Sequence, residues 1–235
     1  MRQDRNPHDL RPITVTPGFN RFAEGSALVK WGETHVLATV TIENKLPPHL
    51  RNKKVREGWL TAEYAMLPRS TPERVQRERL YSGGRSLEIQ RLIGRSLRGA
   101  VDLALFPGKT LLIDVDVLQA DGGTRCAGIL AGYAALHHAA DKLIKAGTLD
   151  EWPLTHELAA VSVGLVNGQA LVDLEFSEDS EAELDLNVVA TAAGEIIEVQ
   201  GGAEGQPVPA ETYVQLVAQG IGAVQRVLET VRGSL

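Results

Sequence analysis

The stretch Leu111-Leu112-Ile113-Asp114-Val115-Asp116-Val117-Leu118 alternates apolar and polar side chains through its two aspartates, which is the pattern of a β-strand with one buried face. Residues 121–125 (Asp-Gly-Gly-Thr-Arg) follow, and the apolar run after them predicts a long helix from about Cys126 to Ala146. A strand joined to a helix by a glycine turn indicates an α/β fold.

The rest of the chain adds hairpins and helices to this unit. Apolar, β-branched runs at 27–31 and 34–42 flank Gly32-Glu33, and a second pair at 159–166 and 169–176 flanks Asn167-Gly168, a strong hairpin signal. We predict one α/β (α+β) domain over residues 1–235, built as a mixed sheet with packed helices. The other predicted elements are strands at 13–16, 185–191 and 195–200, helices at 86–101 and 210–232, and loops at 45–56 and 70–84.

The composition is that of a globular protein, with 43% apolar and 23% charged residues in a chain of 235. Cys126 is the single cysteine, so no internal disulfide can form and a reducing compartment is expected. The first five residues lead into no apolar run, which argues against a signal peptide. No stretch reaches the roughly 18 apolar residues of a membrane helix. These features predict a soluble, cytoplasmic protein.

Charge is distributed unevenly along the chain. The net charge is −6, yet residues 51–98 hold 12 Lys and Arg against 5 Asp and Glu, and residues 173–204 hold 10 Asp and Glu and no basic residue. Such separation suits a polyanionic substrate on one surface and a divalent cation on another. The alternative is that each run is a solvated face.

The turn at 122–125 is the most informative local motif. Gly122 and Gly123 allow the backbone to approach a ligand, and the first amides of the following helix are unpaired donors at its positive end. Thr124 adds a hydroxyl group, and Arg125 adds a planar fork that matches phosphate oxygens. This motif predicts an anion site, although a tight strand-to-helix connection would have the same residues.

A second motif of the same kind precedes the helix predicted at 86–101. Residues 82–85 (Ser-Gly-Gly-Arg) again combine glycines, a helix start and an arginine, Arg85. Two such motifs favour a shared anion site, whereas a loop with Arg85 in solvent is the alternative. Upstream, Arg69, Arg74, Arg77 and Arg79 lie in or beside a proline-containing loop, which would suit contacts with an RNA backbone.

The acidic segment from Asp173 to Asp185 could hold a metal ion. Carboxylate oxygens suit Mg²⁺, which often uses one or two carboxylates and keeps several waters. Asp179 is expected on a loop and Asp185 at the start of the next strand, so the fold could bring them together. The spacing alone is also compatible with a solvated acidic loop, and no histidine or sulfur cluster indicates zinc.

Taken together, the chain resembles the RNase PH family of phosphorolytic exoribonucleases along essentially its whole length. Several long motifs occur in the same order as in that family. They are Leu10-Arg11-Pro12, 58–64 (Gly-Trp-Leu-Thr-Ala-Glu-Tyr), 66–69 (Met-Leu-Pro-Arg), 88–98 (Glu-Ile-Gln-Arg-Leu-Ile-Gly-Arg-Ser-Leu-Arg), 114–125 (Asp-Val-Asp-Val-Leu-Gln-Ala-Asp-Gly-Gly-Thr-Arg), 161–164 (Val-Ser-Val-Gly) and 197–201 (Ile-Glu-Val-Gln-Gly).

The resemblance implies a two-layer, ribosomal protein S5 domain 2-like fold and a homohexamer built as a trimer of dimers. It implies removal of 3′-terminal nucleotides from RNA, notably transfer RNA precursors, with inorganic phosphate as co-substrate and nucleoside diphosphates as products. The site residues that it implies are Arg85, Gly123, Thr124 and Arg125 for phosphate, Asp179 and Asp185 for catalysis and Mg²⁺, and Arg69, Arg74 and Arg77 for RNA.

Three alternatives stay open at this stage. Asp185 could ligate the metal or act as general acid toward the leaving 3′ oxygen. The chain could be a non-catalytic RNA-binding ring subunit, although it has the phosphate arginines and both carboxylates. Water rather than phosphate could attack. One departure from the family is that Asp4-Arg5-Asn6 stands where Asp-Gly-Arg is common, so subunit contacts there could differ.

Overall fold

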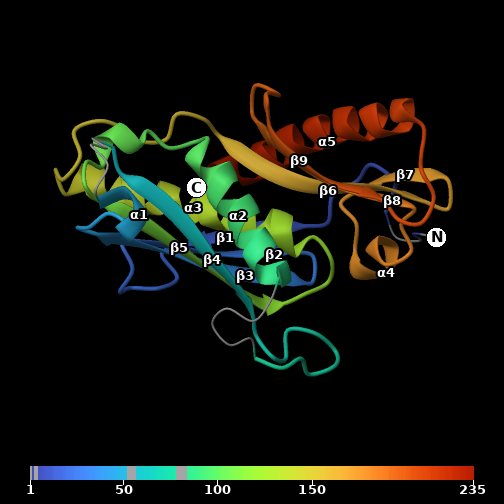
Figure 1. Cartoon of the computed structure of the whole chain (residues 1–235), viewed down its shortest axis with the longest axis horizontal. Coiled ribbons are helices and arrows are strands. Elements are labelled where there is room, and N and C mark those ends of the chain that lie inside the picture. The colour runs from blue at the N-terminus through green and yellow to red at the C-terminus, as the bar shows by residue number, and fades with distance from the viewer. Residues whose placement is uncertain (1, 3–4, 52–56, 78–83) are drawn as a thin grey trace.

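The computed structural model describes residue 2 and residues 5–51, 57–77 and 84–235 (Figure 1). Two β-sheets lie one after the other along the longest axis of the molecule. The first contains, in spatial order, β1 (Ile13–Pro17), β2 (Gly25–Trp31), β3 (Thr34–Glu43), β5 (Thr110–Gln119) and β4 (Trp59–Met66). The second contains β7 (Gln169–Val172), β6 (Leu158–Val166), β8 (Leu184–Thr191) and β9 (Ile196–Ala203).

The first sheet is mixed, as predicted. β4 pairs with β5 in parallel, whereas the neighbours β1–β2, β2–β3 and β3–β5 are antiparallel. The second sheet is antiparallel in all three of its pairs. The helices are α1 (Pro48–Arg51), α2 (Gly84–Arg98), α3 (Thr124–Lys145), α4 (Phe176–Asp179) and α5 (Ala210–Val231), with short 3₁₀ turns η1 (Leu103–Leu105) and η2 (Arg232–Ser234).

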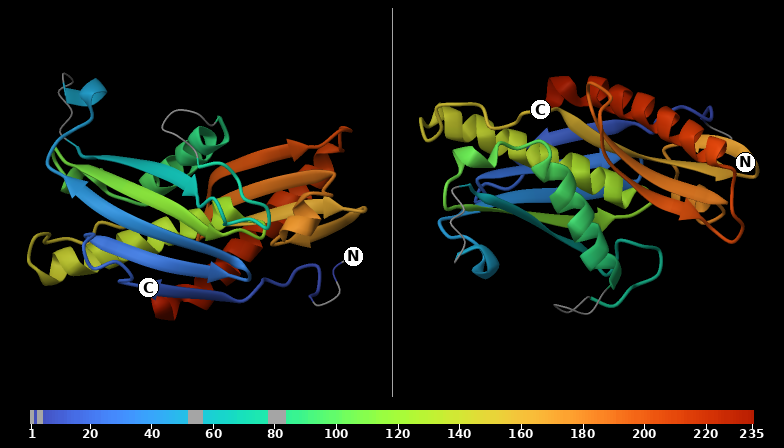
Figure 2. Two further views of the ribbon diagram at one scale, coloured as in Figure 1. Left: turned by 90° about the horizontal axis from the view of Figure 1, so that it is seen from below. Right: turned by 45° about the horizontal axis from the view of Figure 1, so that its top comes forward.

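Helix α3 joins the two sheets. It contacts β1, β2, β3 and β5 of the first sheet and β6 and β8 of the second, while α2 packs on β4 and α5 packs on β6 and β8 (Figure 2). Buried side chains of both sheets and of α2, α3 and α5 form one continuous apolar core. The single domain over residues 1–235 stays a prediction. None of the described helices is both long enough and apolar enough to cross a membrane.

The predicted elements differ from the structure in several places. No element is predicted over residues 57–69, where the structure has strand β4 with Leu60, Ala62 and Tyr64 buried. Its sequence mixes residues that favour strands (Trp, Thr, Tyr) with residues that do not (Ala, Glu), so the local signal is weak. The loop predicted at 45–56 contains the short helix α1. The strand predicted at 169–176 ends at Val172, because Asp173 adopts the left-handed conformation with φ of 57°. Residues 52–56 and 78–83, which fall in the predicted loops, lie outside the described residues.

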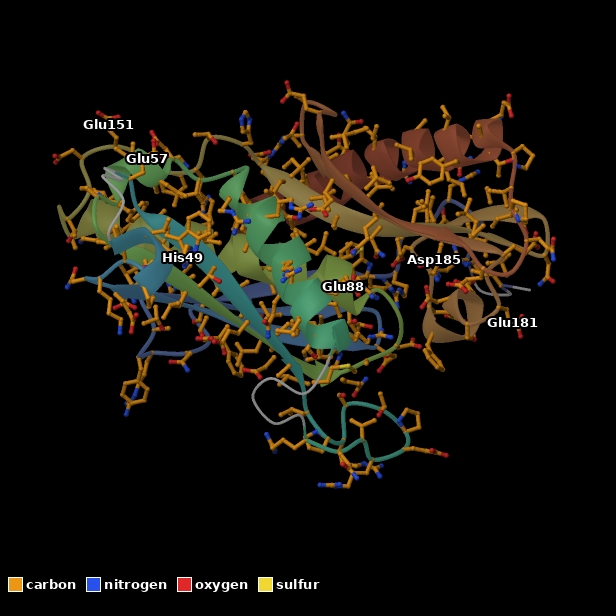
Figure 3. The ribbon with its side chains drawn as sticks, viewed as in Figure 1. His49, Glu57, Glu88, Glu151, Glu181 and Asp185 are labelled. Carbon is orange, nitrogen blue, oxygen red and sulfur yellow. The ribbon has the colours of Figure 1, made fainter. Side chains whose placement is uncertain are left out.

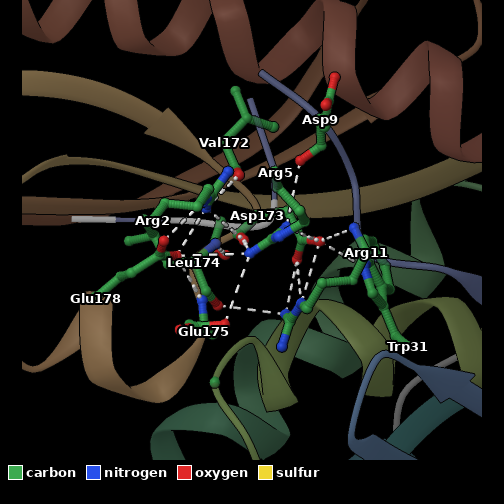
Figure 4. A network of polar contacts seen from close by, with 12 residues as sticks. Arg2, Arg5, Asp9, Arg11, Trp31, Val172, Asp173, Leu174, Glu175 and Glu178 are labelled. Atoms are coloured by element: carbon green, nitrogen blue, oxygen red, sulfur yellow. Dashed lines mark hydrogen bonds and ion pairs between the residues drawn. The ribbon is translucent and has the colours of Figure 1, made fainter. Parts of the chain in front are cut away.

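A buried carboxylate at this break in the strand connects the two halves of the molecule. The side chain of Asp173 is 2% exposed. It accepts hydrogen bonds from the backbone N of Arg11 at 2.6 Å, from Arg11 Nη2 at 2.7 Å and from Trp31 Nε1 at 3.0 Å (Figure 4). Arg11 in turn donates to the carbonyl oxygens of Asp121 and Leu174. One ion pair therefore connects the first sheet, the glycine turn and the segment leading to α4.

Replacing this carboxylate is expected to destabilise the whole protein. In Asp173→Ala the buried guanidinium group of Arg11 loses its counter-ion and Trp31 loses its acceptor, which is expected to lower the free energy of unfolding by about 3–5 kcal/mol. Urea denaturation followed by circular dichroism measures this change. The control is Asp141→Ala, which removes an exposed ion pair with Lys145 on α3 and should cost about 0.5 kcal/mol or less. Similar losses in both variants would contradict the role of Asp173.

Candidate active site

The glycine turn between β5 and α3 lies directly against the segment that enters α4. Gly122 and Gly123 have φ of 69° and 66°, a conformation that side chains with a Cβ atom rarely adopt. A Cβ atom on Gly122 would lie 2.6 Å from the carbonyl oxygen of Leu174 and 2.7 Å from the amide nitrogen of Phe176. Glycine is therefore required here both for the backbone angles and for the close approach of two chain segments.

Hydrogen bonds from two other strands hold this turn in place. The hydroxyl group of Thr34 donates to the Gly122 carbonyl oxygen at 2.7 Å and accepts from the Asp121 amide at 2.9 Å. Tyr64 on β4 donates to the hydroxyl oxygen of Thr124 at 3.0 Å, so the hydroxyl hydrogen of Thr124 can point elsewhere. The turn presents the N-terminus of a 22-residue helix, whose unpaired amides and dipole favour a bound anion.

Arg125 is held at the first turn of α3 by side chains from α2 and β9. Its Nη2 atom lies 3.1 Å from Glu88 Oε2, and Glu88 Oε1 accepts a hydrogen bond from Gln200 Nε2 at 2.7 Å. Arg125 Nε and Gln200 Oε1 are buried and have no hydrogen-bond partner within the described parts of the chain. A buried donor without an acceptor costs about 1–3 kcal/mol, so Arg125 Nε is a ready contact for an incoming anion.

Asp179 and Asp185 lie close enough to influence each other. Asp179 is the last residue of α4, where the sequence predicts a loop, and Asp185 is the second residue of β8, near α4 (Figure 3). Burial raises the pKa of the Asp185 carboxyl group, and the negative charges of Asp179 and Glu204 raise it further, whereas Arg125 lowers it. The position of Asp185 at the start of β8 confirms the predicted strand position. Asp179 is predicted on a loop but lies in the short helix α4.

The predicted phosphate arginines share this region with the carboxylates. Arg85 is the second residue of α2 and is exposed, and Ser82 and Gly83 of its motif lie outside the described residues. Burial raises the pKa of Asp179, whereas the positive charges of Arg125, Arg85 and Arg11 act in the opposite direction. The charges of Arg85 and Arg125 therefore both act on Asp179, and the charge of Arg125 also acts on Asp185.

The two carboxylates are a donor set that fits Mg²⁺. Mg²⁺ needs only one or two protein carboxylates and fills its remaining positions with water and substrate oxygens. Among the described residues no group of three or more His, Cys, Asp or Glu side chains could hold a metal ion. Asp185 experiences the negative charge of Asp179, and a cation between them would offset this repulsion.

The basic loop, residues 67–77 in its described part, starts beside the glycine turn. Leu67 donates its amide to the Val117 carbonyl oxygen at 3.0 Å, and Ala120 donates to the Ser70 carbonyl oxygen at 2.8 Å, so the loop is anchored to the end of β5. From there the loop protrudes from the body of the molecule (Figure 1). Its side chains at Arg69, Arg74 and Arg77 are exposed, and Arg79 and Tyr81 lie outside the described residues.

Sequence reasoning missed the residues that support the site. Glu88 lies three residues after Arg85 on α2, so the two share a helix face, and this spacing could have identified it. Gln200 gave no local signal, and Asp173 was predicted only as part of the acidic segment, because their partners lie 112 and 162 positions away in the sequence. Such contacts become visible only in the folded chain.

The sequence matches a known enzyme family. Residues 9–140 match domain 1, and residues 156–223 match domain 2, of the 3′ exoribonuclease family. The solved structures that resemble the chain include Rrp46 from rice (Oryza sativa), with a TM-score of 0.78 at 22% identity over 98% of both chains. They also include the Archaeoglobus fulgidus exosome with RNA bound to the active site, with a TM-score of 0.79 at 24% identity over 96% of this chain and 90% of that one. The chain belongs to the 3′ exoribonuclease family.

A curated relative narrows the class within this family. The chain is 52% identical over 228 residues to ribonuclease PH of Deinococcus radiodurans, covering 97% of this chain and 92% of the relative. This similarity confirms the RNase PH resemblance, the mixed α/β RNase PH fold and the enzyme class, a phosphorolytic 3′ exoribonuclease and tRNA nucleotidyltransferase.

Gly122 is expected to be sensitive to substitution because of its close backbone contact. Gly122→Ala should lower the thermal unfolding midpoint and RNA shortening together, because the added methyl group pushes the 174–176 segment, and with it α4, away from the turn. Gly168→Ala is the matched control, since Gly168 has a similar φ of 72° but nothing within 4 Å of the position that an added methyl group would take. Differential scanning fluorimetry and an RNA-trimming assay measure both effects. Equal behaviour of the two variants would show that only backbone strain matters.

Proposed function

We propose that this chain shortens RNA from the 3′ end, notably precursors of transfer RNA, in the cytoplasm, using inorganic phosphate at the site formed by α3, α2, α4 and β8. A phosphate oxygen attacks the phosphorus of the terminal phosphodiester. The bond to the 3′ oxygen of the preceding nucleotide breaks, that oxygen takes a proton, and a nucleoside diphosphate leaves. The observation that carries this proposal is the N-terminus of α3, where Arg125 Nε is buried without a hydrogen-bond partner among the described residues. The glycine turn there lies against the segment that enters α4, the helix that contains Asp179.

The first role of the site is to hold the attacking phosphate. Phosphate and phosphodiester are both anions, so positive groups must offset their repulsion and align them. We assign this role to the guanidinium groups of Arg85 and Arg125, the backbone at Gly123 and the hydroxyl group of Thr124. The unpartnered Nε atom of Arg125 supports the assignment, because an anion would supply its missing acceptor.

The second role is to stabilise charge at the reacting phosphodiester. Asp179 and Asp185 would hold Mg²⁺, which when bound supplies Lewis-acid stabilisation of the phosphoryl oxygens. Asp185 is half-buried with a pKa raised above its ordinary value, first by burial and then by neighbouring carboxylates. A carboxyl group in such surroundings can also retain a proton and donate it to the leaving 3′ oxygen. Asp185 therefore keeps both proposed roles, metal ligand and general acid.

RNA would reach this site along the basic loop. Arg69, Arg74 and Arg77 are exposed on a loop whose base adjoins the glycine turn, where contacts with phosphates would be independent of sequence. We further propose that the chain assembles as a homohexamer, a trimer of dimers. On β5 the side chains of Leu112, Asp114 and Asp116 are only partly buried, which leaves one face of the first sheet for contact with another subunit. Sedimentation velocity measures the assembly state.

The proposed reaction is tested by identifying the released nucleotides. A 3′-tailed RNA is incubated with Mg²⁺, with and without inorganic phosphate, and products are separated by ion-exchange chromatography. Nucleoside diphosphates should appear only with phosphate. Asp185→Asn should bind the RNA without shortening it. Release of nucleoside monophosphates in the absence of phosphate would show hydrolysis instead, and RNA binding without any turnover by the unaltered protein would indicate a non-catalytic subunit.

Arg125 is expected to serve phosphate more than RNA. Arg125→Ala should raise the KM for phosphate roughly 10- to 100-fold, because a charge-assisted hydrogen bond contributes about 1.5–3 kcal/mol. The Kd for RNA should change much less. Steady-state kinetics and fluorescence anisotropy measure these quantities. Arg232→Ala, which removes an exposed ion pair with Glu157, is the control and should change neither. Parallel loss of phosphate use and RNA affinity would contradict the assignment.

The basic loop is expected to contribute salt-dependent affinity. Replacing Arg69, Arg74 and Arg77 together by Ala should flatten the plot of log K for RNA against log salt by up to about 2 units, since each contact with a single strand contributes about 0.7. Lys142 and Lys145, at the far end of α3, replaced together by Ala are the control and should leave the slope unchanged. An unaltered slope in the arginine variant would place the RNA on another surface.

A further inference from the structure

The helix that carries Asp179 has little structural support of its own. Helix α4 has four residues, and an isolated helix of that length is unstable because its nucleation cost is not recovered. Of these four residues, all of which are described, only Glu178 is buried, and Phe176 is 65% exposed. The orientation of α4 therefore depends on how Glu178 is held.

Glu178 is held by an arginine from the other end of the chain. Arg2 Nε lies 2.6 Å from Glu178 Oε1, and Arg2 Nη2 lies 2.7 Å from Oε2, a two-bond contact between a guanidinium group and a carboxylate (Figure 4). The two side chains are 6% and 7% exposed. Burial of Glu178 favours its neutral form, but the hydrogen bonds from Arg2 outweigh this effect and lower the pKa of Glu178. The pair is thus ionised and shielded from water.

Arg2 also fixes the chain that leads into α4. Its Nη2 atom donates to the carbonyl oxygens of Val172 at 3.0 Å and Asp173 at 3.1 Å. Arg5 reinforces the contact, since its Nη2 donates to the same Asp173 oxygen at 3.1 Å and lies 3.6 Å from Glu178 Oε2. Glu178 closes the arrangement by accepting from the Glu175 amide at 3.0 Å.

We propose that Arg2, assisted by Arg5, is a positioning residue that sets the place of Asp179 in the active site. Arg2 makes no contact with the phosphate site and acts through Glu178, the residue next to Asp179. This inference depends on the proposed catalytic role of Asp179. It gives Arg2 a function in the reaction that the local sequence does not indicate, because the contact spans 176 positions.

The first test separates positioning from folding. Arg2→Ala should lower kcat roughly 10- to 100-fold, because small displacements of a reacting group have effects of that size, and should leave the KM for phosphate and the Kd for RNA within about twofold. Arg2→Lys keeps the charge but not the two-bond geometry, so its kcat should lie between those of Arg2→Ala and the unaltered protein. Hydrogen-exchange mass spectrometry should show faster exchange in residues 174–181 and unchanged exchange in α3. Arg232→Ala is the control and should match the unaltered protein.

The second test asks whether Arg2 acts through Glu178. Glu178→Gln alone should lower kcat as Arg2→Ala does, and the double variant should be no worse than either single variant, because one contact is lost in all three. A double variant whose loss of kcat equals the product of the two single losses would overturn the inference. So would an Arg2→Ala variant with normal kcat, or one with hydrogen exchange raised throughout the protein. Asp179→Asn tests the underlying assignment separately. Retained turnover in Asp179→Asn would remove Asp179 from the mechanism, whereas loss there with normal Arg2→Ala turnover would reject only the positioning role.

Discussion

The buried ion pair between Asp173 and Arg11 is the constraint on which the site depends. An ionised carboxylate is tolerated in the interior only when donors surround it, and Asp173 meets this condition with Arg11 and Trp31 from the first half of the chain. Because these donors come from β2 and from the segment before β1, they determine where the second sheet can sit. Arg11 extends the connection to the carbonyl oxygens of Asp121 and Leu174.

The two halves contribute complementary chemistry where they meet. The first half supplies the glycine turn, the N-terminus of α3 and the start of α2, all of which carry positive potential. The second half supplies Asp179 and Asp185. Neither half alone could align an anionic nucleophile with a metal-assisted phosphodiester. The Asp173 pair therefore bears on the proposed function, since it sets the distance between the groups proposed to bind phosphate and the groups proposed to hold Mg²⁺.

The site also accepts local costs that a purely structural region would avoid. Arg125 Nε and Gln200 Oε1 are buried without partners in the described part of the chain, and two consecutive glycines adopt the left-handed conformation. Glu88 holds the Nη2 end of the Arg125 guanidinium group and leaves Nε available. Such preorganisation is useful when charge must be stabilised without rearrangement during the reaction, and the short helix α4, held by Arg2, fits the same principle.

The sequence by itself determined most of the elements, and it predicted the residues of the proposed site. Alternation in β5, the hairpin signals and the spacing of apolar residues in α2, α3 and α5 are local patterns, and the glycine turns and paired aspartates are local motifs. Strand β4, the end of β7 at Asp173 and helix α4 were decided by tertiary structure, because each depends on partners distant in sequence. The same holds for the contacts of Glu88 with Arg125 and of Arg2 with Glu178. A hydrogen bond between residues 176 positions apart leaves no periodic signal, so only the folded chain reveals which charges meet.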